Sequence, residues 1–307
     1  MSKANGAKIA IIGCGKVGMT AAYSILHSGV AREILLVGRT LDSITGEELD
    51  LEHGMSFLHP AKVSSTIDYA DLADSDVVIY TAGAAQEPGE SRLALADKNI
   101  KILSGILPNI IKHAPDSILL LVTNPVDILT YKAYIQAEWP KGRVIGSGTT
   151  LDTARFRFHL SESLKIDPRS IHAYVLGEHG DHSFPALSSA TVGGQLLLTL
   201  PEMNKDKALK AFDQARTAAY KIIQAKGATF YAIGTAVSHI VSAIVTDSRK
   251  VLPLSVPLHQ YYGHSGVALS MPCVVGRAGV HEVLHPQLSS QEQRQLAECV
   301  SELKKYL

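Results

Sequence analysis

A glycine-rich turn near the N-terminus constrains the fold of this chain more than any other feature. Gly13, Gly15 and Gly18 follow the apolar run Lys8–Ile12 and open the amphipathic stretch Val17–Ser28. In a strand–turn–helix unit, these glycines permit a tight turn, close approach of the backbone to a pyrophosphate, and close helix–strand packing. The helix N-terminus favours a bound anion. The spacing predicts a dinucleotide-binding unit, and a turn without a ligand is the alternative.

Short apolar runs alternate with helical patterns through the first half of the chain. The runs are rich in β-formers and lack polar alternation, which is typical of buried parallel strands. Pro108 is expected to break or kink the third helix. The alternation predicts an α/β fold with a Rossmann-type doubly wound parallel sheet. The expected strands are Lys8–Ile12, Glu33–Val37, Asp76–Thr81 and Ile118–Thr123, and the expected helices are Val17–Ser28, Leu41–Phe57 and Leu93–His113.

The pattern changes near Ser147, which predicts a dinucleotide-binding domain over 1–146 and an α+β substrate or catalytic domain over 147–307. Gly227 is the expected C-cap of a long helix, and Ser289 with Glu292 forms a capping box for the last one. That last helix places Leu296, Val300, Leu303 and Leu307 on one stripe. The other expected helices are Thr150–Leu164, Lys205–Lys226 and Thr229–Asp247, and the expected strands are Ile171–Leu176, Ser255–His259, Val267–Val275 and Val280–Leu284.

Composition excludes several classes of protein. The 29 basic and 29 acidic residues balance, so nothing indicates a nucleic acid partner. The three cysteines are too few and scattered for a disulfide framework or a metal cluster, and they suit a reducing compartment. No segment approaches the roughly 20 apolar residues that span a bilayer. We therefore expect a soluble, cytoplasmic protein without a metal site or a membrane partner.

The end of the second strand departs from the usual dinucleotide pattern. An acid that binds the adenine ribose is expected about 20 residues beyond the glycines. Gly38 and Arg39 stand there instead. A cation without the carboxylate suits a ribose 2′-phosphate, which favours use of NADP, shared or preferred. The alternative is that Arg39 lies on the adenine or points to solvent.

Three residues in the second half carry acid–base and anion-binding chemistry. Asp152 and Arg155 lie three apart, so a helix would place both side chains on one face. His179 lies between glycines after the apolar run Ile171–Leu176. A carboxylate can orient and charge an imidazole, while a guanidinium can bind a carboxylate through two hydrogen bonds. A structural ion pair with an ordinary loop histidine is the alternative.

Two more segments follow strands whose carboxyl ends face the ligand in a doubly wound sheet. The loop from Thr81 through Gly83 and Gln86 to Arg92 contains Pro-Gly and is expected to close over a substrate. Arg92 could stabilise negative charge on a carbonyl oxygen. Asn124 could donate to the same oxygen, and its bond to the following proline is a candidate cis peptide.

Together these motifs resemble the L-lactate/malate dehydrogenase family over nearly the whole chain: the glycine fingerprint, the Gln86-to-Arg92 loop, Val-Thr-Asn-Pro, Leu-Asp-Thr-Ala-Arg and Gly-Glu-His-Gly-Asp. The resemblance implies that His179 donates a proton and is held by Asp152. Arg155 would bind the substrate carboxylate, and Arg92 and Asn124 would polarise the ketone. NAD is the cofactor that it implies, bound at Gly13, Gly15, Val17, Gly18, Arg39, Thr81, Gly83, Ala84, Val122 and Asn124.

The resemblance also bears on the substrate. Malate dehydrogenases of the family place an arginine at the position of Gln86, where it pairs with a second carboxylate. A neutral Gln86, with Thr229 as a lactate-type pocket residue, favours pyruvate, because an unpaired buried carboxylate costs several kcal/mol. Another 2-hydroxy acid, malate included, is the alternative substrate. A catalytically silent dinucleotide-binding protein is the alternative of a different class.

Arg157 and His172 match residues that bind fructose 1,6-bisphosphate in allosteric bacterial members of the family. Arg157 is two positions past Arg155, so on a helix it faces away from the substrate residues. The alternative is a pair of ordinary surface residues. The resemblance further implies a homotetramer built from dimers.

Overall fold

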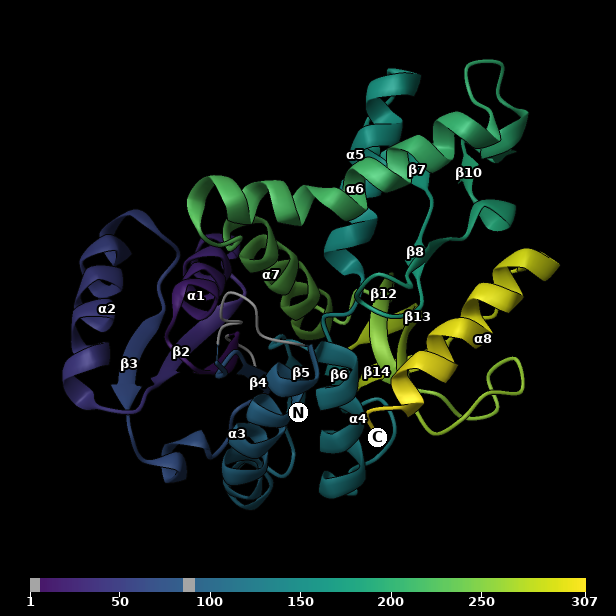
Figure 1. The fold of residues 1–307 in the computed structure, drawn as a ribbon. Helices are drawn as coiled ribbons and strands as arrows, with labels where there is room; N and C mark the ends of the chain where they lie inside the picture. The colour runs from purple at the N-terminus through teal and green to yellow at the C-terminus, as the bar shows by residue number, and fades with distance from the viewer. Residues whose placement is uncertain (1–5, 85–91) are drawn as a thin grey trace.

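The computed structural model describes residues 6–84 and 92–307, with the side chains of Arg92 and Leu93 left out. A nine-stranded sheet runs through the molecule in the order β14-β13-β12-β6-β5-β4-β1-β2-β3 (Figure 1). The strands from β1 to β6 are parallel, as expected for a doubly wound sheet. Their bounds are β1 (Ala7–Ile12), β2 (Ala31–Val37), β3 (Lys62–Thr66), β4 (Val77–Tyr80), β5 (Ile118–Leu121) and β6 (Val144–Gly146).

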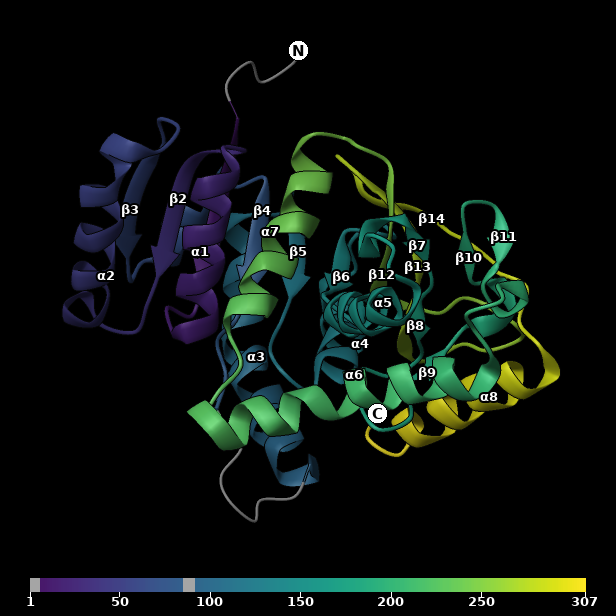
Figure 2. The same cartoon turned by 90° about the horizontal axis from the view of Figure 1, so that it is seen from above.

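Helices cover both faces of this sheet (Figures 1 and 2). Successive residues of β1 point to opposite faces, so Ile9 and Ile11 pack in one apolar cluster with α1 and α7, whereas Ala10 and Ile12 pack in another with α3 and α4. The helices are α1 (Lys16–Ser28), α2 (Leu41–Gly54), α3 (Arg92–His113), α4 (Val126–Ala137), α5 (Thr150–Leu164), α6 (Lys205–Lys226), α7 (Tyr231–Val245) and α8 (Ser290–Lys304).

The second half of the chain extends the same sheet. Strand β12 pairs antiparallel with β6 through Ser255 and Gly146, and β13 and β14 continue outward. Gly234 of α7 lies so close to α1 that a Cβ there would stand 2.6 Å from the side chain of Thr20. The strands that extend the sheet are β12 (Lys250–Pro257), β13 (Ala268–Gly276) and β14 (Gly279–Val283). Two small separate sheets contain β7 (Ile171–His172), β10 (Thr191–Val192) and β11 (Gln195–Leu196), and β8 (Val175–Leu176) and β9 (Phe184–Pro185).

Two sequence predictions about regular structure need correction. Pro108 was expected to break or kink its helix, and the break is wrong, because the α-helix continues to His113. An internal proline costs about 3 kcal/mol, and burial of neighbouring Leu107 and Ile110 offsets it at about 1.5–3 kcal/mol each. The run Ile171–Leu176 forms two strands, β7 and β8, in different small sheets.

Several helix ends agree with the prediction. Gly227 caps α6 in the left-handed conformation, with φ of 83°. Ser289 and Glu292 form the expected capping box of α8. Leu296, Val300 and Leu303 of that helix are buried, whereas Leu307 lies beyond its end. The helix predicted over Leu41–Phe57 is α-helical only to Gly54 and closes with a 3-10 turn.

None of the helices in the described part of the chain combines the length and apolarity that crossing a membrane requires.

Candidate active site

The glycine turn between β1 and α1 has the geometry of a pyrophosphate cradle. Gly13 has φ of 104°, and a Cβ there would lie 2.5 Å from the backbone nitrogen of Ala82. A Cβ on Gly18 would lie 2.1 Å from the carbonyl oxygen of Gly13, so both positions require glycine. At Gly15, by contrast, no atom of the other described residues lies within 4 Å of where a Cβ would be. The turn therefore leaves open space at the N-terminus of α1, which fits a dinucleotide phosphate.

Thr81, directly after β4, connects this turn to the neighbouring strand of the sheet through its hydroxyl. Its hydroxyl donates to the carbonyl of Gly13 at 2.7 Å and lies 3.1 Å from that of Ile12. A Cβ on Gly83 would meet the Thr123 side chain at 2.4 Å. Thr81 and Gly83, both predicted from the sequence, thus fix the start of the loop after β4 against its neighbours. Val17, Ala84, Val122 and Asn124, also predicted from the sequence, line the adjoining cavity.

Asn99 is a site residue that sequence analysis missed. It is buried on α3, where its side-chain oxygen accepts from the Ala84 backbone at 2.7 Å. Its amide donates to the Asn124 carbonyl at 2.7 Å, so it joins the loops after β4 and β5. The available signal was an amide among the apolar positions of the helix pattern, between Ala96 and Leu103.

Gly38 and Arg39 stand directly after β2, where an acid that binds the adenine ribose is usual. A Cβ on Gly38 would lie 2.3 Å from Cγ2 of Ile44, so α2 packs directly on this glycine. Arg39 is exposed at the entrance to α2. The cation is thus accessible to a ligand at this end of the strand.

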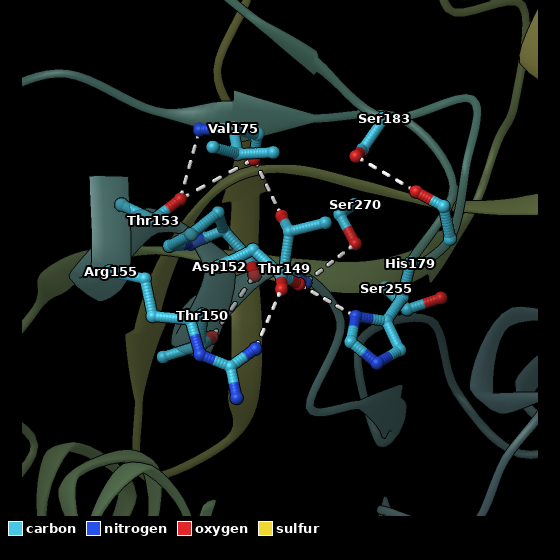
Figure 3. Close-up of polar contacts among 12 residues, drawn as sticks. Thr149, Thr150, Asp152, Thr153, Arg155, Val175, His179, Ser183, Ser255 and Ser270 are labelled. Carbon is cyan, nitrogen blue, oxygen red and sulfur yellow. Dashed lines mark hydrogen bonds and ion pairs between the residues drawn. The ribbon is translucent and has the colours of Figure 1, made fainter. Parts of the chain in front are cut away.

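Asp152 and Arg155 lie on one helix face, as their spacing predicted, and His179 meets them there, as the family resemblance implied (Figure 3). Nδ1 of His179 lies 2.6 Å from Oδ2 of Asp152, and Nη1 of Arg155 lies 3.3 Å from Oδ1 of the same carboxylate. Asp152 and Arg155 come from α5, whereas His179 comes from the loop after β8. Asp152 therefore holds an imidazole with one oxygen and a guanidinium with the other.

The charges in this cluster support each other. Burial opposes a charge on His179, but the charge and hydrogen bond of Asp152 outweigh it and raise the pKa of His179 to about 9. Burial likewise opposes ionisation of Asp152, yet His179 and then Arg155 hold its pKa below the usual value. The imidazole is consequently protonated at neutral pH, with Nδ1 directed at the carboxylate.

Arg155 retains an unused donor. Its side chain is 12% exposed, and its Nη2 is a buried atom without a hydrogen-bond partner among the described residues. A buried donor in this state favours an incoming acceptor. Both Arg155 and His179 line a cavity of about 480 Å3, so an anion can reach them together.

Both halves of the chain form the walls of this cavity. Asn124 comes from the loop after β5, Thr229 and Ile233 from the α6–α7 junction, and Tyr306 from the end of the chain. Thr229 thus lies where the sequence predicted a pocket residue. Gln86 and the side chain of Arg92 lie outside the described residues; the backbone of Arg92 begins α3.

Asp127 is the second residue that sequence analysis missed. It is 2% exposed, and its carboxylate accepts from the backbone N–H of His179 at 2.7 Å and from the Ser255 hydroxyl at 2.5 Å. Burial raises the pKa of Asp127 to about 7, although these two hydrogen bonds oppose the shift. Its position in the first turn of α4 resembles that of an ordinary acid at a helix start, which hid its role.

Hydroxyl groups brace α5 against β8. Thr149 Oγ1 donates to the carbonyl of Val175 at 2.6 Å, and the Val175 N–H donates to Thr153 Oγ1 at 2.9 Å (Figure 3). Ser270 accepts from the Thr149 N–H at 3.0 Å. These buried contacts hold the helix with Asp152 against the strand that leads to His179.

Arg157 and His172 lie apart from the cavity. Nε of Arg157 donates to the carbonyl of Ala173 at 2.9 Å, and its guanidinium lies 4.9 Å from the centre of the Tyr174 ring. His172 is exposed on β7. Burial lowers the pKa of the nearby His239 imidazole, and the charges of Lys250 and Arg157 lower it further.

Among the described residues, no group of three or more His, Cys, Asp or Glu side chains is placed to hold a metal ion.

Two family models together match almost the whole chain. The lactate/malate dehydrogenase NAD binding domain matches residues 7–146, and the lactate/malate dehydrogenase alpha/beta C-terminal domain matches residues 149–307. The first model adds the identity of the dinucleotide to the geometry of the glycine turn: the cradle is that of an NAD-binding domain.

Known proteins are similar over the same length. The L-lactate dehydrogenase of Lacticaseibacillus casei is 43% identical, over 98% of this chain and 93% of its own. The L-lactate dehydrogenase of Clostridium botulinum (strain Loch Maree / Type A3) is 42% identical, over 100% of this chain and 98% of its own. The crystal structure of the minor L-lactate dehydrogenase from Enterococcus mundtii in the ligands-bound form superposes with a TM-score of 0.94 at 37% identity, covering 98% of both chains. The chain belongs to the lactate/malate dehydrogenase family.

Proposed function

We propose that this protein is an NAD-dependent oxidoreductase that interconverts pyruvate and L-lactate. The observation that carries the proposal is that Nη2 of Arg155 has no hydrogen-bond partner within the described part of the chain, while the protonated His179 lines the same cavity. A 2-keto acid has a carboxylate next to a carbonyl, so one small molecule can engage both residues. The full-length similarity to L-lactate dehydrogenases supports the same substrate pair.

In this mechanism, Arg155 binds the substrate carboxylate through its free donor and orients the keto carbon. Asp152 keeps His179 charged and aimed, and Nε2 of that ring donates the proton to the carbonyl oxygen. Asn124, and Arg92 by resemblance, stabilise the negative charge that develops there. When bound, NADH supplies the hydride. In lactate oxidation, neutral His179 takes the hydroxyl proton back.

The substrate assignment predicts a strong preference for pyruvate over oxaloacetate. Arg155 already engages one carboxylate, and Gln86 offers no charge to a second one. We expect kcat/KM to be at least a hundredfold higher for pyruvate, because an unpaired buried carboxylate costs several kcal/mol. Steady-state rates with pyruvate, oxaloacetate and 2-ketobutyrate measure this. Faster turnover of oxaloacetate would identify a malate dehydrogenase, and no turnover of any of them would favour a silent dinucleotide-binding protein.

We also propose that NADP can be used beside NAD, because Gly38 and exposed Arg39 replace the usual acid. A charged hydrogen bond contributes about 1.5 kcal/mol, so Arg39→Ala should weaken NADPH binding about tenfold and leave NADH binding unchanged. Dissociation constants from nicotinamide fluorescence test this without turnover. Arg32→Ala is the matched control, since exposed Arg32 lies at the opposite end of β2. Equal effects of both substitutions, or wild-type NADPH binding in Arg39→Ala, would contradict the proposal.

Regulation by fructose 1,6-bisphosphate is a further proposal from the family resemblance. The charges of Arg157 and Lys250, which both act on His239, and the exposure of His172 support it. The contact of Arg157 with Ala173 weighs against it, since that guanidinium already has one acceptor. Repeating the pyruvate assay at subsaturating substrate with and without the bisphosphate tests it.

The assembly, the location and the domain division are proposals as well. Exposed apolar side chains on and after α2, namely Leu41, Leu49 and Phe57, support a homotetramer, and Phe57 is 89% exposed. The three cysteines are free thiols, which supports a cytoplasmic location. We assign residues 1–146 to dinucleotide binding and 147–307 to the substrate, although the sheet continues across this boundary.

A further inference from the structure

A second buried carboxylate reaches the loop that carries His179. Asp127, in the first turn of α4, uses Oδ2 to accept from the His179 backbone N–H and Oδ1 to accept from the hydroxyl of Ser255. Ser255 is fully buried on β12. Both oxygens of Asp127 thus accept hydrogen bonds from other parts of the chain, and the residue is almost fully buried.

This contact lies at a structural junction. Ser255 is the residue through which β12 pairs with Gly146 of β6. Asp127 therefore ties together α4, the added strands and the His179 loop. The start of the loop is held separately, because Gly177 and Ser270 exchange two backbone hydrogen bonds of 3.1 and 2.9 Å. A side chain at Gly177 is excluded, since its Cβ would lie 2.6 Å from Sγ of Cys299.

The charges around His179 explain how a second carboxylate can stabilise the protonated imidazole. Asp152 divides its two oxygens between His179 and Arg155, and the positive charge of Arg155 opposes protonation of the imidazole. Asp127 acts in the opposite sense, together with Asp152. With Asp127 ionised, two carboxylates balance the two cations; without it, the cluster has a net positive charge that disfavours the imidazolium.

The other titratable groups that face Asp127 are Glu178, His179 and Cys299. Glu178 disfavours its ionisation, while the charge on His179 favours it. Glu178 itself lies 2.7 Å from Nδ1 of His182. Burial raises the pKa of the Cys299 thiol to about 12, so this group stays neutral.

We propose that Asp127 is a positioning residue for His179: it fixes the backbone N–H of the histidine and supplies a second negative charge that keeps the imidazole protonated. The inference rests on the proposed role of His179 as proton donor. Asp127 borders the same cavity, but both its oxygens already accept hydrogen bonds from His179 and Ser255, so it acts through His179. In pyruvate reduction it raises the fraction of enzyme that can donate a proton, and in lactate oxidation it stabilises the cation that forms.

The direct test is the titration of the His179 ring by NMR in the complete enzyme labelled at histidine. The pKa of His179 is raised above 6.5, so the ring loses its proton as the pH rises through about 9. Asp127→Asn keeps the shape but removes the charge. Its titration midpoint should fall by about one pH unit, as expected for loss of a nearby opposite charge. Ser255→Ala is the matched control: near pH 9 its Asp127 is still ionised, so the midpoint should stay within about 0.3 unit.

Activity gives a second readout. In Asp127→Asn, the alkaline limb of pyruvate reduction should move to lower pH with the ring, and kcat/KM at pH 9 should fall about fivefold, because the protonated fraction of His179 falls from about one half to about one eleventh. The dissociation constant for NADH should stay within twofold of wild type. A folded Asp127→Asn enzyme with an unchanged midpoint would overturn the inference, as would equal shifts in Asp127→Asn and Ser255→Ala, which indicate altered packing instead.

Wild-type enzyme provides a test if Asp127→Asn does not fold. The His179 resonance should show a smaller inflection near pH 7, where Asp127 ionises, before its main titration near pH 9. A single transition would overturn the inference. Because the titration needs no turnover, this failure is distinct from failure of the proposed function, in which the ring titrates as described but pyruvate is not reduced.

Discussion

Replacing His179 with alanine should slow pyruvate reduction by about a thousandfold, the usual contribution of a positioned general acid. The imidazole is the group whose pKa the site raises to about 9, and it lines the cavity together with Arg155. Single-turnover oxidation of bound NADH at pH 7 measures the chemical step. Binding of NADH should be nearly unchanged, since the glycine turn lies on β1 and α1.

His182→Ala is the matched control for this experiment. His182 lies on the same loop, is exposed, and pairs with Glu178 rather than with Asp152. We expect its hydride transfer rate to stay within a few-fold of wild type. An undiminished single-turnover rate in His179→Ala would show that another group supplies the proton.

Replacing Arg155 with glutamine should lower kcat/KM for pyruvate more than a hundredfold. The substitution removes both the charge and the unpartnered Nη2 donor, and loss of a buried partner of a carboxylate costs about 3 kcal/mol. Most of the effect should be an increase in KM, because Arg155 binds the carboxylate in the ground state as well as in the transition state. Steady-state kinetics with pyruvate measure the division between KM and kcat.

Two further variants define what Arg155 contributes. Arg155→Lys retains a charge but loses the paired donors, so its kcat/KM should fall between wild type and Arg155→Gln. Arg169→Gln is the surface control, because Arg169 is 89% exposed and pairs with Asp167. If Arg155→Gln binds pyruvate as well as Arg169→Gln does, the carboxylate is bound elsewhere.

Local patterns predicted much of the fold because they report local physics. Glycines at 13, 15 and 18 follow a buried strand, and each position has the steric or open environment that the pattern requires. The spacing of Asp152 and Arg155 on one helix likewise predicted their contact. Burial prevailed over the tendency of proline to end a helix: α3 does not end at Pro108, because its neighbours are buried against the sheet.

The sequence alone determined the parallel α/β order, the dinucleotide turn and the residue types that handle an anion and a proton. Only the tertiary structure decided which carboxylates lie close enough to His179 to stabilise its positive charge. Asp127 lies 52 residues before His179 and 128 before Ser255, and no spacing rule connects them. They meet because β12 joins the sheet beside β6, which buries a carboxylate where only specific donors can satisfy it. Such contacts depend on how distant segments pack, so they become visible only once the chain is folded.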